Sequence, residues 1–185
     1  PKEVRKGSLK INVSTSSFVP KPFTPFQWEA QISREEISRR VHLVRELFKG
    51  QKCLKLRWHE PAMSHLEGVL SRADRRMADV VEKAYHKGAI FCSWMEGFDL
   101  APWLEALDEC GISAEACIGA REAGGPLPWS HLEAGVSEEF LLRERERALA
   151  EKIPQDCRYG ACRQCGACDT KAGPSRLPHA TVAAE

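Results

Sequence analysis

The sequence has no long apolar run, and this absence argues against a helical membrane span. No stretch of its 185 residues approaches the roughly 18 consecutive apolar residues that a spanning helix requires. The opening residues, Pro1-Lys-Glu-Val-Arg-Lys, also lack the apolar core of a signal peptide. We therefore expect a soluble, cytoplasmic protein with no membrane partner.

The chain also lacks an excess of charge of either sign. Its 27 Lys and Arg residues balance 26 Asp and Glu residues, which leaves a formal net charge of +1. This balance gives no global electrostatic reason to expect binding to nucleic acid. The sequence contains no Gly-rich phosphate loop, no nucleophile elbow and no catalytic Ser/His/Asp order. We therefore assign no catalytic residue within it.

Cysteine, by contrast, is abundant and unevenly distributed. Of the eight cysteines, four fall within twelve residues, and clustered thiols in a reducing compartment favour metal coordination over disulfides. The clustered four are Cys157, Cys162, Cys165 and Cys168. The other four are scattered, and we expect them to be small buried residues of the core. These are Cys53, Cys92, Cys110 and Cys117.

The spacing of the cluster, Cys-x4-Cys-x2-Cys-x2-Cys, suggests which metal it binds. Zinc ribbons usually bring two Cys-x2-Cys knuckles together from distant segments, whereas all four ligands here come from one short loop. The run from Cys162 to Cys168 has the spacing of ferredoxin-type loops. Gly160 and Gly166 allow the tight turns that let successive thiolates face one centre. The loop therefore predicts a 4Fe-4S cluster, with zinc, disulfides or free thiols as the alternatives.

Hydrophobic periodicity predicts a mostly helical chain with two short strands. Residues 9–13 and 53–58 alternate apolar and polar side chains, as half-buried strands do. Ser33 and Glu36 have the spacing of a capping box at the start of a helix. Apolar stripes, caps and terminating glycines place helices at about 34–48, 62–71, 75–87 and 138–151. A further short helix is expected with Pro102 in its first turn and Gly111 as its stop.

Two segments carry aromatic residues that we expect to act as anchors. The stretch 18–28 holds three prolines and four aromatic residues, which excludes helix and favours an extended, packed connection. Residues 119–130 form a Gly- and Pro-rich loop around Trp129. The tryptophans lack the interleaved basic residues of a base-stacking platform, so we expect core anchoring.

Two groups of polar residues could have either a structural or a functional role. His59-Glu60 and His65 do not form a zinc-protease motif, because Met63 stands where the second His belongs. We expect a polar cluster capping the strand at 53–58, with a substrate-facing acid–base pair as the alternative. The basic group at Arg72, Arg75 and Arg76 is expected to be a solvated helix face.

Several stretches resemble a known family. The segment Asn12-Val-Ser-Thr-Ser-Ser-Phe-Val-Pro-Lys-Pro-Phe-Thr-Pro-Phe-Gln-Trp28 resembles the end of a radical S-adenosylmethionine (radical SAM) barrel, where the last strand enters a Phe-Val-Pro-Lys-Pro-x-Thr-Pro-Phe connection. Residues 58–76, Pro126-Leu-Pro-Trp129, residues 135–144 and the Cys loop resemble the C-terminal region of one largely uncharacterised branch. Members of that branch carry a cobalamin-binding-like region before the barrel. The resemblance covers about residues 9–169.

The resemblance implies an intact parent protein that binds S-adenosylmethionine and a 4Fe-4S cluster and generates a 5′-deoxyadenosyl radical. This chain lacks the Cys-x3-Cys-x2-Cys loop that holds the catalytic cluster in that family. It begins without Met, and a strand pattern follows within ten residues, so we expect a piece of a longer protein that is inactive alone. The four-Cys loop is then expected to be an auxiliary cluster.

The expected fold class is an α/β fragment, predominantly helical. Residues 1–30 are expected to be the end of the barrel, with the upstream part of the same barrel as their partner. Residues 31–152 are a mostly helical extension with a short strand near 53–58, residues 153–169 are the metal loop, and residues 170–185 are a disordered tail. The competing hypothesis is a zinc-stabilised RNA- or protein-binding module without catalytic activity. Family context also allows an RNA or ribosome-linked substrate for the whole enzyme.

Overall fold

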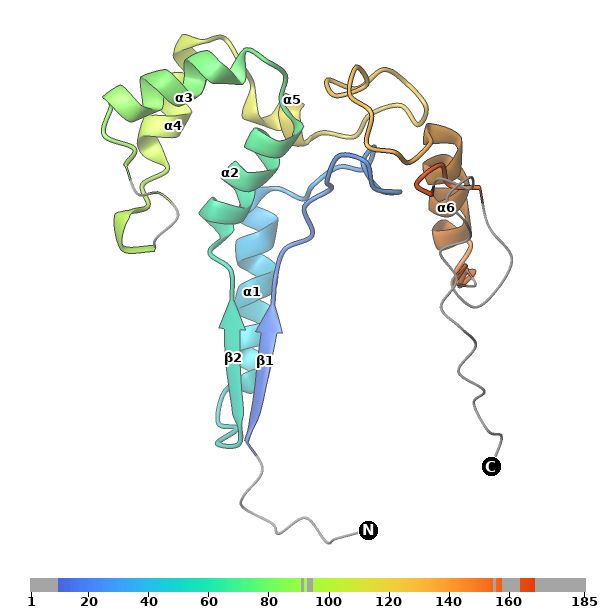
Figure 1. Ribbon diagram of the computed structural model, residues 1–185. Helices are drawn as coiled ribbons and strands as arrows, with labels where there is room; N and C mark the ends of the chain where they lie inside the picture. The colour runs from blue at the N-terminus through green and yellow to red at the C-terminus, as the bar shows by residue number, and fades with distance from the viewer. Residues whose placement is uncertain (1–9, 91, 93–94, 155, 158–163, 169–185) are drawn as a thin grey trace, which may run out of the picture. The chain divides into compact units, whose positions relative to one another are not determined.

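The chain is described from a computed structural model that covers residues 10–90, 92, 95–154, 156–157 and 164–168. Its strands are β1 (Ile11–Thr15) and β2 (Leu54–Trp58), as Figure 1 shows. Its helices are α1 (Arg34–Phe48), α2 (Pro61–Arg72), α3 (Met77–His86), the 3-10 turn η1 (Met95–Gly97), α4 (Ala101–Glu109), α5 (Ala114–Ile118) and α6 (Glu138–Leu149). The described chain is therefore mixed α/β, with mostly helical regular structure.

The chain divides into two compact units, which we call unit 1 and unit 2. Unit 1 comprises Pro1–Pro20 and Ala30–Ala120, and unit 2 comprises Lys21–Glu29 and Arg121–Glu185. The sequence had suggested a boundary near residue 30, with the aromatic connection joined to β1. In the structure, residues 21–29 instead pack with the C-terminal part of the chain.

The strands and the first helix form a β–α–β arrangement within unit 1. β1 and β2 pair in parallel, with Ile11 opposite Leu54 and Thr15 opposite Trp58. Parallel neighbours need a crossover connection, and α1 supplies it (Figure 1). The predicted helix over 34–48 is confirmed, and the Ser33 side chain accepts a hydrogen bond from the Glu36 amide as the capping box requires. Both strands therefore end at the same edge of the sheet.

This β–α–β arrangement leaves apolar surface uncovered. No residue of either strand is fully buried. Ile11 is 42% exposed, and Leu43 and Leu47 of α1 are 55% and 71% exposed. Parallel sheets normally have both faces covered, and an isolated pair of strands has little stability of its own.

The core of unit 1 lies among α2, α3, α4 and α5. Val69, Val80, Ala84 and Ala106 are completely buried there. Across α3 and α4, Lys83 and Lys87 form surface ion pairs with Glu109 and Glu105. The predicted helices over 62–71 and 75–87 are confirmed within a residue or two at their boundaries, and Gly88 ends α3 with a φ of +96°.

Arg72 corrects the prediction of a solvated basic face. Its side chain is completely buried. Its Nε donates to the carbonyl of Cys117 at 3.1 Å, and an Nη donates to the carbonyl of Gly119 at 2.8 Å. These are backbone groups at the end of α5, where helix carbonyls have no partner within the helix. Arg72 therefore holds α5 on α2, and only Arg75 and Arg76 remain exposed.

Unit 2 is built around two tryptophans. Trp28, Leu127, Trp129 and Leu141 form its buried apolar cluster. The side-chain oxygen of Gln27 accepts hydrogen bonds from the Phe23 amide and the Trp129 indole, both at 2.9 Å. The predictions that the tryptophans anchor the core and that residues 119–130 wrap Trp129 are confirmed for these positions.

The prediction that the scattered cysteines are small buried residues of the core is confirmed only in part. Cys117 is buried, as expected, but Cys92 and Cys110 are half-buried and Cys53 is exposed. Cys53 immediately precedes β2 in a turn, whereas Cys92 and Cys110 pack against the core of unit 1. Their burial could not be read from residue type alone, because local position overrides the usual preference of free Cys.

The helices of the described ranges are too short or too polar to cross a bilayer. The expected disordered tail, 170–185, lies outside the described residues.

Candidate functional site

Three of the four predicted metal ligands lie in described parts of unit 2. Cys157 and Cys165 are half-buried and Cys168 is exposed. Cys162 lies outside the described residues. Among the residues that the structure covers, no three His, Cys, Asp or Glu side chains are grouped so as to hold a metal ion. The ligand set that the spacing predicts therefore stays a prediction.

The backbone around Cys165 makes a tight reversal. Gln164 and Gly166, on either side of it, have positive φ values of 54° and 93°. Left-handed backbone on both flanks turns the chain sharply, as a loop must when successive thiolates are to face one centre. The donor set and the turn therefore fit a compact four-thiolate centre, although the described thiols are not gathered.

The cysteine loop is fastened to the start of α6. The Ser137 amide donates to the Cys165 carbonyl at 2.7 Å. Ser137 is the N-cap of α6, and its hydroxyl accepts from the Phe140 amide at 3.3 Å. A side chain at Gly166 would meet the Gly135 carbonyl at 3.1 Å, so glycine permits this close approach. One short segment, 135–137, thus connects the loop to the helix.

A cavity of about 350 Å³ adjoins this attachment within unit 2. Its apolar lining includes Phe23, Leu127 and Trp129, and Gly166 of the cysteine loop contributes to its edge. Glu133 and Glu138 also line it. The cysteine loop therefore borders a cavity, and this neighbourhood was not predicted from the sequence.

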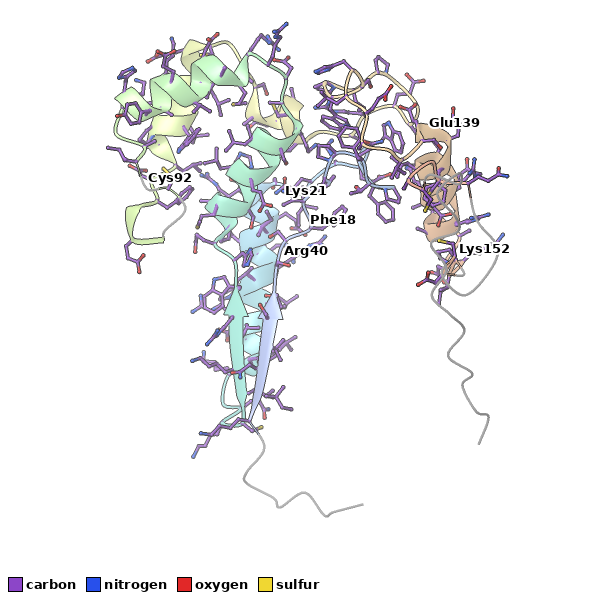
Figure 2. The ribbon with its side chains drawn as sticks, viewed as in Figure 1. Phe18, Lys21, Arg40, Cys92, Glu139 and Lys152 are labelled. Atoms are coloured by element: carbon purple, nitrogen blue, oxygen red, sulfur yellow. The ribbon has the colours of Figure 1, made fainter. Side chains whose placement is uncertain are left out.

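Unit 1 contains a cavity at the end of β1, of about 430 Å³. Its lining includes Thr15, Ser16 and Ser17 together with apolar residues of α1. Arg40 and Phe18, labelled in Figure 2, also line it. The Arg40 guanidinium is bonded to Glu36 at 2.7 Å, and Glu36 also pairs with Arg39. Hydrogen bonds from Arg39 and Arg40 lower the pKa of Glu36 to about 2.

A larger cavity of about 590 Å³, which we call the α2 cavity, follows one side of α2 in unit 1. His59 and Glu60, which the sequence singled out, both line it, and His59 also reaches the cavity at the end of β1. The remaining wall comes from residues to which the sequence had assigned no role in a site. The lining residues are Trp58, His59, Glu60, Met63, Ser64, Leu66, Glu67, Leu70, Cys92, Phe98 and Trp103.

His65 does not join His59. It lies on a buried side of α2, where its Nδ1 has no hydrogen-bond partner among the described residues. Burial, together with the nearby Arg34 charge, lowers the pKa of His65. The predicted polar cluster of His59, Glu60 and His65 is therefore divided between an open cavity and the packed interior.

No family model, curated protein or solved structure matches this chain.

Proposed function

We propose that this chain is the C-terminal part of a radical SAM iron–sulfur enzyme and carries an auxiliary four-Cys centre, a 4Fe-4S cluster. The observation that carries the proposal is the spacing of Cys157, Cys162, Cys165 and Cys168 within twelve residues. Four thiolates from one loop suit a cubane, whose corners lie far enough apart for closely spaced ligands to reach different irons.

The packing of unit 2 supports a metal centre. Its buried apolar cluster, as far as the described residues show, consists of two tryptophans and two leucines. Small domains with limited cores are commonly stabilised by a disulfide or a metal. The loop's attachment through Ser137 and Cys165 would let a bound metal stabilise the start of α6. Binding that gathers the thiolates would then contribute directly to the stability of unit 2.

The β1–α1–β2 arrangement supports a larger parent. Two parallel strands with half-exposed side chains need further strands or helices to cover them. The upstream part of the same barrel would supply that cover and also the S-adenosylmethionine site. An RNA or ribosome-linked substrate, and a cobalamin-binding region, belong to the same proposal for the whole protein.

The proposed centre does not perform the chemistry. A cluster with four Cys ligands has no open iron for a substrate, so electron transfer or clamping of the loop is its role. We expect this chain alone to have no catalytic activity, because it lacks the Cys-x3-Cys-x2-Cys loop.

Anaerobic reconstitution of the 185-residue chain tests the metal. We expect a brown protein with about four irons and four sulfides per chain. Cys165→Ser and Cys168→Ser should each lower the iron content, whereas Cys53→Ser, which alters an exposed cysteine of unit 1, should not. One bound zinc without sulfide would contradict the iron–sulfur proposal and support the zinc module.

The zinc-stabilised RNA-binding alternative has little structural support. Arg72 is buried, and Arg76 forms an ion pair with Asp74 at 2.8 Å. The predicted basic face is thus reduced to Arg75 and a partly neutralised Arg76. Steeply salt-dependent RNA binding that survives iron chelation would nevertheless favour that alternative.

A further inference from the structure

The α2 cavity has the dimensions and lining of a small-molecule site. Its volume of about 590 Å³ lies within the range of roughly 300–1,000 Å³ typical of ligand pockets. It begins where β2 ends, at Trp58, and continues along α2 as far as Leu70. In parallel α/β structures, ligands bind beyond the carboxyl ends of strands. The position of the cavity is therefore one that suits binding.

Aromatic and soft apolar side chains make up most of the wall. Trp58, Phe98 and Trp103 supply three aromatic rings, and Met63 supplies a polarisable thioether. Cys92, labelled in Figure 2, lies in the connection between α3 and α4 and adds a thiol. A wall of this kind attracts a ring or a branched apolar group by burial of its surface.

The charged residues of the wall indicate whether the cavity favours a cationic or an anionic ligand. Among the eleven lining residues that the structure describes, none is Lys or Arg and one is a histidine, His59, whereas Glu60 and Glu67 are acidic. An anionic ligand would lose its hydration and meet no Lys or Arg in the described wall, whereas a cation would be attracted to the Glu60 carboxylate and to the faces of the aromatic rings. The Arg45 guanidinium already lies 4.8 Å from the ring centre of Trp58, so the charge of a ligand is assigned to Glu60 and only its apolar body to Trp58.

We infer that the α2 cavity binds a compact amine with an aromatic or apolar body, its ammonium group facing Glu60 and its body lying against Trp58 and Trp103. Glu60 suits this role because it stands at the start of α2 and makes no side-chain capping hydrogen bond. This inference goes beyond the proposed metal centre and does not depend on it, since every lining residue that the structure describes belongs to unit 1.

Three probes with the same ring and linker test the inference on the full 185-residue chain. They are phenethylamine, 2-phenylethanol and 3-phenylpropionate, which differ in charge. We expect phenethylamine to bind roughly tenfold or more tightly than 3-phenylpropionate, with 2-phenylethanol between them. Titration by ¹H–¹⁵N NMR should shift the indole N–H signals of Trp58 and Trp103. The indole signal of Trp129, in unit 2, is the internal control.

Two substitutions separate charge from shape. Glu60→Gln should weaken phenethylamine roughly two- to fivefold, as expected for an exposed ion pair, and leave 2-phenylethanol unchanged. Glu82→Gln, at an exposed position of α3 outside the cavity lining, is the matched control and should change neither. Leu70→Trp should fill the cavity and weaken both ligands, and unshifted amide signals of α3, which does not line the cavity, would show that unit 1 still folds.

The inference is overturned if phenethylamine shows no saturable binding, or if 3-phenylpropionate binds as tightly. It is also overturned if the shifts avoid Trp58 and Trp103, or if Glu60→Gln and Glu82→Gln act alike. Iron content should be the same in every variant. Failure of the amine site and failure of the metal proposal are thereby distinguishable.

Discussion

Unit 1 and unit 2 each have a hydrophobic core of their own, and the two cores differ in size and composition. In unit 1, thirteen buried apolar residues from the helices α2 to α5 and their connections form one cluster. In unit 2, the corresponding cluster has four residues among those described, and half of them are tryptophans. A large helical core distributes its stability over many contacts, whereas a small aromatic core depends on each member.

In unit 2, specific hydrogen bonds and an ion pair contribute to stability alongside the small apolar core, whereas unit 1 relies more on apolar burial. Gln27 is almost completely buried and accepts from both Phe23 and Trp129. The Arg121 amide donates to the Trp28 carbonyl at 2.8 Å, and Arg145 pairs with Glu29 at 2.7 Å. These contacts join residues 21–29 to a part of the chain about a hundred positions away. Unit 2 therefore depends on specific partners as well as on burial.

The strongest test of this comparison removes one tryptophan from each core. Trp129→Ala should cost about 3–5 kcal/mol, because it deletes a buried aromatic side chain. That loss is comparable to the whole stability of a small unit, so unit 2 should unfold while unit 1 persists. Hydrogen exchange of the amides in α6 and in α2 measures the two units separately. Trp103→Ala is the matched change in unit 1, and unit 1 should still unfold in a cooperative transition in this variant. If Trp129→Ala unfolded both units together, the comparison would be contradicted.

A smaller effect is expected from the one buried guanidinium described in unit 1. Arg72→Met should lower the free energy of unfolding by about 1.5–3 kcal/mol, because it removes charge-assisted hydrogen bonds to buried carbonyls. Chemical denaturation followed by circular dichroism checks this. Arg75→Met, at an exposed neighbouring position, should stay within about 0.5 kcal/mol of the unchanged protein. Equal effects of the two substitutions would show that the burial of Arg72 is not stabilising.

Gly68 tests how tightly the edge of the unit 1 core is packed. A Cβ there would overlap the side-chain oxygen of Gln31, whose Nε2 donates to the Ser64 carbonyl at 2.8 Å. Gly68→Ala should therefore cost about 1–3 kcal/mol. In a Gln31→Ala background the same change should be neutral or stabilising, because alanine is the better helix former. A penalty that persists in that background would point to a different cause.

The smallest effect concerns pH and should be confined to unit 1. Burial lowers the pKa of His65 in the folded state, with Arg34 acting in the same direction and Glu115 and Glu35 opposing it. The unfolded chain therefore binds more protons as the pH falls below the ordinary His value of about 6.5. The contribution of His65 to stability is present above that pH and is lost progressively below it. His65→Leu should flatten this slope, whereas His42→Gln, at an exposed site of α1, should leave it unchanged.

Local patterns predicted the elements of the fold well. The helix over 34–48, the strand that ends at Trp58 and the Ser137 cap of α6 all follow from residues close together in the chain. Capping and periodicity are short-range effects, so a sequence displays them directly. The short helix α5 was not predicted, since five residues contain too little of a periodic pattern.

The sequence by itself determined the spacing of the four cysteines, the caps and the apolar stripes, because each of these depends on neighbours within a few residues. Only the tertiary structure decided that Arg72 is buried, that His59 and His65 separate, and that Phe98 and Trp103 complete a cavity with Glu60. These relations join residues from different elements, and their distances depend on how the helices pack. The same holds for residues 21–29, which pack with the C-terminal part of the chain through contacts that no local pattern encodes.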